Sequence, residues 1–340
     1  MLNDGEPAIG RAQTTSPPVP HRGHAPSEVD QPIAAALSTE RITVGRPGPI
    51  FEARPPDPSH RLVPFRPDTT LDGWSNKHLA VRGVSIRGEQ HRFDGSPRQD
   101  DFALLLRKDG QQLIVAVADG VSAAPQSHLG SSIAVRYAVQ WLDAKLSEDT
   151  QEPDWQDLVK SAAWALAEQA AVLFGVENNA SAVEQLLATT LVCAVIDFGE
   201  DGSARVQIVN IGDSGAWVLT RGQYTQIAGG KHGSIDGLTS SSVSGLPRVP
   251  EEVRATHVTI EPGEILLIGT DGFGDPLGDG SGDVGRLFSS LLESQPPAIL
   301  DFARAVDFSR ETFDDDRTLV GVWPLTPEQA LENQAPMSTS

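Results

Sequence analysis

The chain has 340 residues, of which 46 are acidic and 26 are basic, so its formal net charge is −20. This balance argues against binding to nucleic acid, which relies on clustered Lys and Arg, and it permits binding of cations. The longest apolar run, residues 186–196, is too short to cross a bilayer, and no N-terminal stretch resembles a signal peptide. We therefore expect a cytoplasmic protein that binds neither nucleic acid nor membranes.

The first part of the chain differs in composition from the rest. Thirteen of the 25 prolines fall within the first 67 residues, among Ser, Thr, Gly and charged residues that show little hydrophobic periodicity. We expect residues 1–75 to form a disordered, Pro-rich tail, residues 76–325 to form one domain, and residues 326–340 to form a flexible C-terminal tail. Removal of residues 1–72 is then expected to leave the activity of the domain nearly unchanged.

Hydrophobic periodicity predicts the elements of the domain. Strands are expected near residues 79–88, 102–107, 113–118, 190–198, 204–211, 215–220, 256–260, 264–269 and 317–323. Apolar residues at helical spacing predict helices over residues 127–146, 154–175, 283–293 and 297–307. Long helices among many hairpin-linked strands indicate an α+β domain with a mostly antiparallel sheet. The single cysteine, Cys193, lies within a predicted strand, where we expect it to pack as a small apolar residue.

Asp-Gly pairs mark the ends of several predicted strands. Asp109-Gly110 and Asp201-Gly202 each lie between two strands and are typical of hairpin turns. Asp119-Gly120 and Asp271-Gly272 also follow apolar strands, but a loop and a helical pattern come after them. These two pairs close no hairpin, so their carboxylates need another explanation.

Other carboxylates also gather where predicted strands begin or end. They are Asp100, Asp101, Asp119, Asp213, Asp271, Asp314, Asp315 and Asp316. If these strand ends converge, several like charges share a small space, which is unfavourable without a cation. Mg²⁺ and Mn²⁺ prefer carboxylate, carbonyl and water oxygens, and two such ions can activate a water for attack on phosphorus. Zinc fits poorly, because the predicted domain has neither a Cys cluster nor a closely spaced His pair.

Six short motifs carry a resemblance to a known family. In sequence order they read RQDDFALL, VAVADG, ATTL, NIGDSGAWVL, LLIGTDGF and DDDRTLVGVW. Together they resemble the metal-dependent Ser/Thr protein phosphatases of type 2C. The resemblance implies two packed antiparallel β-sheets flanked by helices, an α-β-β-α sandwich, with a two-metal centre at one end. It also implies hydrolysis of phosphoserine and phosphothreonine in proteins by a metal-bridging water, without a phosphoenzyme intermediate. Phosphorylated proteins, the targets of a Ser/Thr kinase, would be the substrates, and we expect a monomer.

The resemblance assigns metal ligation to Asp100, Asp119, Gly120, Asp213, Asp271 and Asp315. In this assignment Asp119 bridges two Mg²⁺ or Mn²⁺ ions, and Gly120 contributes its carbonyl oxygen. Asp213, together with Asp271, can hold a third, weaker ion, although Asp213 is also typical of a turn between two strands. The last motif of the family has Asn where this chain has Asp316.

The basic and proton-donating residues depart from the family pattern. The phosphate-binding Arg of the family would fall at Gly95, and Arg92 and Arg98 lie on either side of it. We favour Arg92, because a guanidinium fork suits a phosphate dianion, while either Arg is equally compatible with a solvated surface position. Val121 stands where some members have a proton-donating His, so the acid that protonates the leaving group is unassigned. His128 is nearby in sequence, but a surface position at a helix N-terminus is the favoured interpretation for it.

A Gly- and Ser-rich loop and a rival function complete the sequence hypothesis. The loop lies between the motifs YTQIAGG and ATHVTI, where the family has a flap beside the cleft, and a loop of this length is expected to influence substrate choice.

The alternative function is a catalytically weak, phosphatase-like binding or regulatory module. Retention of all four principal acids disfavours that alternative.

Overall fold

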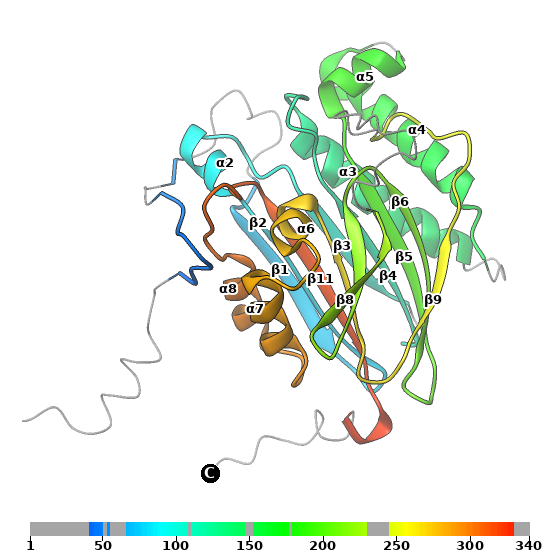
Figure 1. Ribbon diagram of the computed structural model, residues 1–340. Coiled ribbons are helices and arrows are strands. Elements are labelled where there is room, and N and C mark those ends of the chain that lie inside the picture. Colours follow the sequence, from blue (N-terminus) through cyan, green and yellow to red (C-terminus); the bar gives the residue numbers. More distant parts are fainter. Residues whose placement is uncertain are drawn as a thin grey trace, which may run out of the picture. The chain divides into compact units, whose positions relative to one another are not determined.

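The computed structural model describes residues 41–49, 53–54, 66–107, 110–146, 152–176, 179–229 and 245–329 (Figure 1). All of these residues belong to one compact unit, which begins at Arg41. The predicted C-terminal tail from residue 330 onward and most of the predicted N-terminal tail lie outside the described residues.

Two antiparallel β-sheets form the centre of this unit. The six-stranded sheet has the order β1 (Thr69–Ser75), β2 (Leu79–Ile86), β11 (Arg317–Pro324), β10 (Ile265–Gly269), β7 (Gly215–Thr220) and β8 (Gln223–Ala228). The five-stranded sheet has the order β3 (Asp101–Leu106), β4 (Gln112–Ala118), β5 (Leu191–Phe198), β6 (Ala204–Ile211) and β9 (Thr256–Ile260). The predicted α+β class with antiparallel sheets is confirmed.

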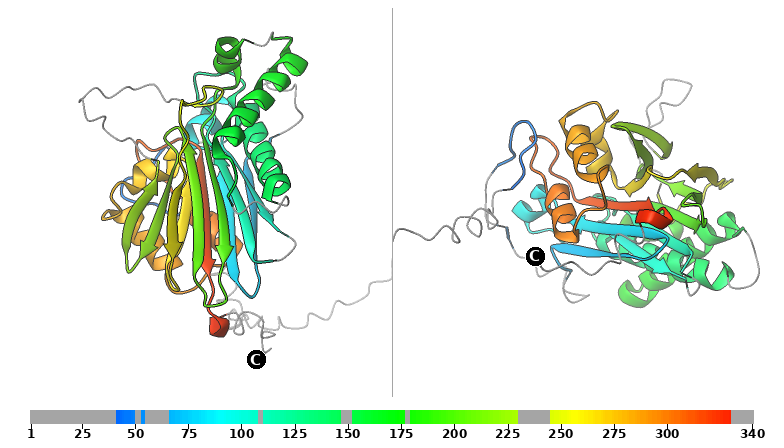
Figure 2. Two further views of the ribbon diagram at one scale, coloured as in Figure 1. Left: turned by 90° about the vertical axis from the view of Figure 1, so that its right-hand side faces the viewer. Right: turned by 90° about the horizontal axis from the view of Figure 1, so that it is seen from below.

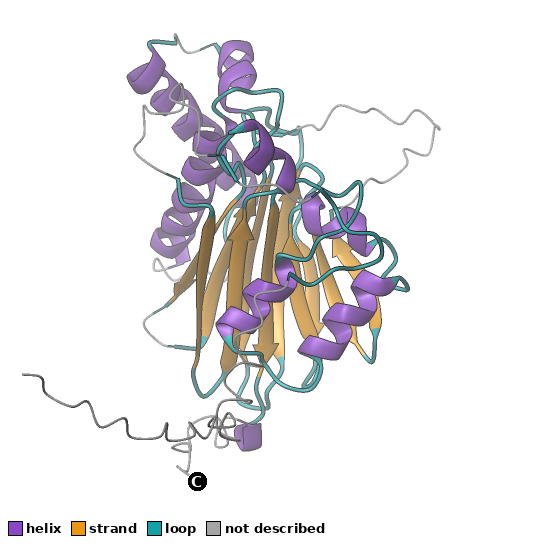
Figure 3. Ribbon diagram, turned by 90° about the vertical axis from the view of Figure 1, so that its left-hand side faces the viewer, coloured by secondary structure: helices purple, strands orange, loops and turns teal. Residues whose placement is uncertain are grey.

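Helices cover the outer face of each sheet (Figures 2 and 3). The five-stranded sheet packs against α3 (Ser127–Leu146), α4 (Trp155–Phe174) and α5 (Ala180–Leu187). The six-stranded sheet packs against α6 (Asp271–Leu277), α7 (Asp283–Leu292) and α8 (Ile299–Val306). A short helix, α2 (Glu89–Asp94), follows β2. The layers are therefore helix, sheet, sheet and helix, as the resemblance implies.

Alternation along the strands explains why both faces of each sheet are buried. In β4, Leu113, Val115 and Val117 point between the two sheets. Ile114 and Ala116 point to the opposite face and pack under α3 and α4. Successive side chains of a strand point to opposite faces, so a central strand covered on both sides must be apolar throughout. Burial of each aliphatic side chain stabilises the folded state by about 1.5–3 kcal/mol. The continuous apolar runs of the central strands are therefore the clearest secondary-structure pattern in the sequence.

The structure confirms both predicted hairpins. It also confirms that the other two Asp-Gly pairs close no hairpin. Gly110 and Gly202 adopt φ values of 74° and 83° in the turns after β3 and β5, while Asp109 lies outside the described residues. In contrast, Asp119-Gly120 leads from β4 toward α3, and Asp271 is the first residue of α6. Cys193 is buried in β5 beneath the helices, as predicted, and burial raises the pKa of its thiol.

Two segments within the range assigned to the N-terminal tail pack onto the domain. In residues 41–49, the Val44 side chain is buried, and its N–H donates to the Ser309 carbonyl at 3.0 Å. Arg41 forms ion pairs with Glu89 and Asp307. Further along, β1 pairs with β2 over its whole length. The domain therefore includes an N-terminal strap, residues 41–49, and the edge strand β1. The hydrophobic pattern of the sequence predicted neither of them.

Candidate metal centre

The topology brings the predicted acids to one end of the sandwich. Asp100 precedes β3 and Asp119 follows β4, and these strands are antiparallel neighbours with Asp101 paired opposite Ala118. In the other sheet, Asp271 follows β10 and Asp315 precedes β11, with Gly269 paired opposite Leu319. In an antiparallel pair, the start of one strand lies beside the end of its neighbour. Each sheet therefore contributes two acids to the same end of the sandwich.

Asp100 is held at the junction between the sheets. Its side chain is buried, and its Oδ2 atom accepts hydrogen bonds from Thr270 Oγ1 at 2.7 Å and Thr318 Oγ1 at 2.9 Å. Burial, followed by the charges of Asp316 and Asp315, raises the pKa of Asp100 well above its usual range. The next acid, Asp101, differs because two arginines, Arg66 and Arg98, lie 3.2 Å and 3.8 Å from its carboxylate.

The ATTL motif fixes the backbone of Asp119. Thr190 Oγ1 accepts the Asp119 N–H at 2.9 Å, and Thr190 N–H and Thr189 Oγ1 both donate to the Asp119 carbonyl at 2.8 Å. These bonds leave the carboxylate as the part of Asp119 directed to its acidic neighbours. Burial raises the pKa of Asp119 well above its usual range, and the charges of Asp100 and Asp271 add to this shift.

Gly120 lies where no side chain fits. A Cβ atom at this position would lie 2.8 Å from the Ser127 carbonyl oxygen and 2.9 Å from that of Gln99. Glycine therefore lets the chain pass between the start of α3 and the segment that precedes Asp100. This explains the residue type, while metal ligation by the Gly120 carbonyl stays a prediction.

Three of the predicted acids form one cluster. Carboxylate oxygens of Asp119, Asp213 and Asp271 all lie within 4.8 Å of one another. Asp213 reaches this cluster from the turn between β6 and β7, where the hydroxyl of the next residue, Ser214, lies 2.8 Å from Thr190 Oγ1. Asp213 therefore occupies the turn that its sequence pattern indicates and also faces two of the other acids.

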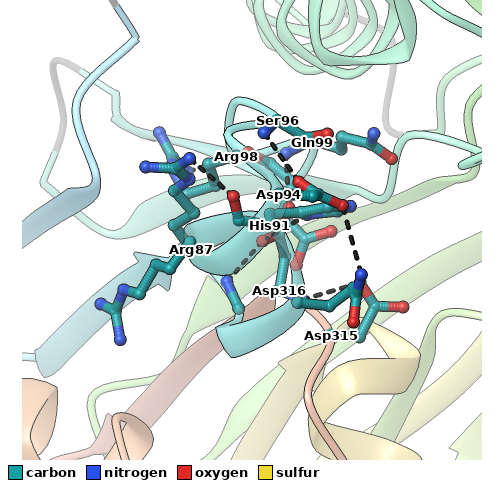
Figure 4. Close-up of polar contacts among 12 residues, drawn as sticks. Arg87, His91, Asp94, Ser96, Arg98, Gln99, Asp315 and Asp316 are labelled. Atoms are coloured by element: carbon teal, nitrogen blue, oxygen red, sulfur yellow. Dashed lines mark hydrogen bonds and ion pairs between the residues drawn. The ribbon is translucent and has the colours of Figure 1, made fainter. Parts of the chain in front are cut away.

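Asp315 and Asp316 form a second cluster with a histidine that the sequence analysis did not single out (Figure 4). The Asp315 side chain keeps contact with solvent, yet partial desolvation and the charges of Asp316 and Asp271 raise its pKa to about 6. Burial alone would raise the pKa of Asp316, but the hydrogen bond and charge of His91 lower it below its usual value. Burial would lower the pKa of His91, whereas its bond to Asp316 raises it to about 9.

The two candidate phosphate-binding arginines make other contacts. The Arg92 guanidinium pairs with Asp68 at 2.7 Å and with Asp307 at 3.1 Å. Arg98 is buried, and it donates to Thr70 Oγ1 and the Asp100 carbonyl, each at 2.8 Å. Phosphate binding by Arg92 therefore stays a prediction. His128 is buried in the first turn of α3, so its interpretation as a surface residue was wrong.

A small cavity opens beside the acids, with a volume of about 200 Å³. Its lining includes Asp271, Asp275, Asp314 and Asp315. A larger hollow of about 610 Å³ lies along the edge strand β9, and none of the predicted site residues lines it. The predicted flap falls mostly on residues 230–244, outside the described part of the chain.

The donor set fits hard divalent cations. The clustered acids offer carboxylate oxygens, and burial together with the charges of neighbouring acids raises the pKa values of Asp100, Asp119 and Asp315. Mg²⁺ and Mn²⁺ are stable in such oxygen-rich sites.

Among the described residues, no helix combines the length and the apolar character that a membrane crossing requires.

Comparison with known proteins gives a consistent family match. Residues 87–304 match the family model described as protein phosphatase 2C. A bacterial serine phosphatase has 17% identity and a TM-score of 0.50, and the match covers 73% of this chain and 99% of that protein. RsbX in complex with magnesium has 15% identity and a TM-score of 0.49, covering 75% and 100%. The catalytic domain of the serine threonine protein phosphatase PstP, in complex with 2 manganese ions, has 20% identity and a TM-score of 0.46, covering 72% and 98%. The search of curated proteins found no match.

Proposed function

This chain belongs to the protein phosphatase 2C family, and we propose that it hydrolyses phosphoserine and phosphothreonine esters in proteins in a reaction that depends on Mg²⁺ or Mn²⁺. The family match and the fold support the general activity of a metal-dependent protein phosphatase. The observation that carries the proposal is the convergence of strand-end acids from both sheets on one small region. Burial and the charges of neighbouring acids raise the pKa values of Asp100 and Asp119, and a bound cation would stabilise their ionised forms.

We assign the ligand roles as follows. Asp119 and the carbonyl of Gly120 would hold the two ions together with Asp271, the acid at the start of α6, and Asp119 would be shared between both ions. Asp100 and Asp315 would contribute from the segments before β3 and β11, and Asp213 with Asp271 would hold a third, weaker ion. The contacts of these residues with one another support this assignment.

The ions supply Lewis acidity that activates a water and stabilises charge on the phosphoryl group. The protein orients the ligands: Thr270 and Thr318 fix the carboxylate of Asp100, and Thr189 and Thr190 fix the backbone of Asp119. Arg92 is our candidate for binding the phosphate, which requires it to exchange contacts with Asp68 or Asp307 for contacts with substrate. Phosphoproteins made by a Ser/Thr kinase would be the substrates.

The decisive experiment measures turnover of a phosphothreonine peptide by the full chain with Mn²⁺, with Mg²⁺ and with excess EDTA. We expect turnover with either ion and none with EDTA, and we expect Asp119→Asn to lose at least about 100-fold, as the loss of a group that stabilises the transition state usually does. Full turnover in EDTA would contradict the proposal. Binding of the peptide without turnover under every condition would support the alternative, a phosphatase-like binding module.

A further inference from the structure

The carboxylate of Asp316 joins three separate segments (Figure 4). Its Oδ1 atom accepts from the Gly88 N–H at 2.6 Å and lies 2.9 Å from His91 Nδ1. Its Oδ2 atom accepts from the Gln99 N–H. The side chain is buried, so all three contacts form away from solvent, where hydrogen bonds to a charged acceptor are strong.

One of these donors, the Gln99 N–H, lies beside a proposed ligand, and Asp316 itself lies beside another. Gln99 directly precedes Asp100, and Asp316 directly follows Asp315. Gly88 is the N-cap of α2, and His91 lies within that helix. A single carboxylate therefore fixes the segment of Asp315 relative to the segment of Asp100, although these acids are more than 200 residues apart in sequence.

The arrangement explains why this chain has Asp where the related motif has Asn. A carboxylate only accepts hydrogen bonds, whereas an amide has one accepting oxygen and one NH₂ donor. Three N–H groups converge on Asp316, with His91 Nδ1 assigned as a donor because its partner is a carboxylate. An amide here would place its NH₂ group against at least one N–H group.

Two glycines let neighbouring segments approach the backbone of Asp315 and Asp316, the loop that precedes β11. A Cβ atom on Gly88 would lie 2.2 Å from the backbone carbon of Asp315, and a Cβ atom on Gly272 would lie 1.8 Å from the carbonyl oxygen of Asp316. The loop backbone is thus enclosed by the N-terminus of α2 on one side and by α6 on the other. Within that enclosure, the contacts of Asp316 act together with those of the Arg317 guanidinium, which donates to the carbonyls of Gly272 and Phe313.

Taking the proposed function as given, we infer that Asp316 and His91 are positioning residues for the metal centre. They set the spacing between Asp100 and Asp315 and thereby the affinity for the divalent ions, without ligating those ions. Loss of such an outer contact typically weakens metal binding 10–100-fold. The competing arrangement, in which His91, Asp315 and Asp316 hold an ion directly, is possible within their 4.8 Å spacing and is an outcome of the test.

The test measures Mn²⁺ affinity of the full chain by titration calorimetry, together with thermal unfolding in EDTA. Asp316→Asn and His91→Leu are expected to weaken Mn²⁺ binding by about 10–100-fold. His91→Asn, which keeps an N–H donor near the position of Nδ1, is expected to remain within about threefold of the parent, since the contact to the carboxylate is retained. His257→Leu is the matched control, because His257 pairs with Glu152 at the surface at 3.3 Å, and we expect it to bind Mn²⁺ as the parent does.

Turnover measurements separate positioning from a merely structural role. In Asp316→Asn, the Mn²⁺ concentration for half-maximal turnover should rise with the loss of affinity, while kcat at saturating Mn²⁺ and KM for the peptide stay within a few-fold of the parent. Unaltered Mn²⁺ affinity in folded Asp316→Asn would overturn the inference, whatever its melting temperature. Equal loss of affinity in His91→Asn and His91→Leu would also overturn it, and would indicate direct ligation by His91. If His91→Leu does not fold, Asp316→Asn and His91→Asn still give opposite expectations.

Failure of the proposed function would be visible separately. A parent protein that neither binds Mn²⁺ nor hydrolyses the peptide would contradict the proposed function. A parent that does both, beside an Asp316→Asn variant with the same Mn²⁺ affinity, would contradict only the positioning role.

Discussion

At the scale of single residues, the metal-free site stores electrostatic repulsion. At the 4.8 Å limit that bounds Asp119, Asp213 and Asp271, Coulomb's law with an effective dielectric of about 20 gives roughly 3 kcal/mol per ionised pair. Solvent lowers this repulsion, because the side chains are only half-buried and the charges are partly screened. Protonation of one acid would lower the repulsion further, and burial together with the charges of Asp100 and Asp271 raises the pKa of Asp119 in that direction.

The substitution Asp271→Asn tests this repulsion. In EDTA, we expect the variant to melt at the same temperature as the parent or up to a few degrees higher, because one like charge is removed. With Mn²⁺ we expect weaker binding and loss of most turnover. Asp275→Asn is the control: it removes the same charge from the wall of the adjacent cavity, outside the cluster, and should retain Mn²⁺ binding. Parental activity in Asp271→Asn would show that this acid is only a turn residue.

The raised pKa of Asp315 predicts a pH dependence. The carboxyl titrates at about 6 in the metal-free fold instead of at its ordinary value of 3.8, so the folded state binds more protons than the unfolded state between these values. The free energy of unfolding of the metal-free protein should therefore fall as the pH rises through this window. Mn²⁺ must displace the same proton, so its affinity should rise over that range. Melting curves and Mn²⁺ titrations between about pH 4 and pH 6.5 check both slopes. Asp315→Asn should reduce them, and the raised pKa values of Asp100 and Asp119 should account for the part that remains.

At the scale of elements, the central, deeply buried strands were predicted most accurately from the hydrophobic pattern. The central strands β4, β5 and β10 are apolar on both faces and were predicted within a residue or two. The edge strands β1 and β8 were missed because most of their side chains are exposed or only half-buried. The short helices α2, α5 and α6 were missed as well, since each spans at most about two turns and gives little periodicity.

The same distinction applies to the site. Asp119 and Asp271 were predictable because each ends an apolar strand and closes no hairpin. His91 was not, because its position depends on α2 being folded against the Asp315-Asp316 segment, a contact between residues far apart in sequence. Arg66 is a similar case, since its support of the Asp100 and His128 carbonyls follows from the tertiary fold alone.

The strap and the edge strand change the expectation for truncation. Deletion of residues 1–72 would remove Val44, Arg66 and about half of β1, all of which contact the domain. We expect this deletion to destabilise the domain by at least about 2 kcal/mol, the value of one buried aliphatic side chain, and to lower turnover. Deletion of residues 1–40 should leave both properties near parental values, because the compact unit begins at Arg41. Equal melting temperatures and turnover for the two truncated proteins would restore the expectation drawn from composition.

At the scale of the whole domain, the proposed metal centre would connect the two sheets. Asp100 and Asp119 extend from β3 and β4, while Asp271 and Asp315 extend from β10 and β11, so an ion held between them contacts both halves of the sandwich. Binding to the folded state stabilises it by about 2.7 kcal/mol when the ion is present at 100 times its dissociation constant. For a domain of this size, that corresponds to a rise in melting temperature of roughly 5–10 °C.

Hydrogen exchange can show whether this stabilisation extends across both sheets. Saturating Mn²⁺ should slow amide exchange at the ends of β4 and β10 that adjoin Asp119 and Asp271, because opening either end would break the shared ion site. The edge strand β9, which carries none of the proposed ligands, should respond less. In Asp119→Asn, the Mn²⁺-dependent protection should be lost in both sheets together, since this residue is the proposed bridge. Protection confined to one sheet in the parent would mean that the ions are held by that sheet alone, and the proposed bridging role of Asp119 would have to be abandoned.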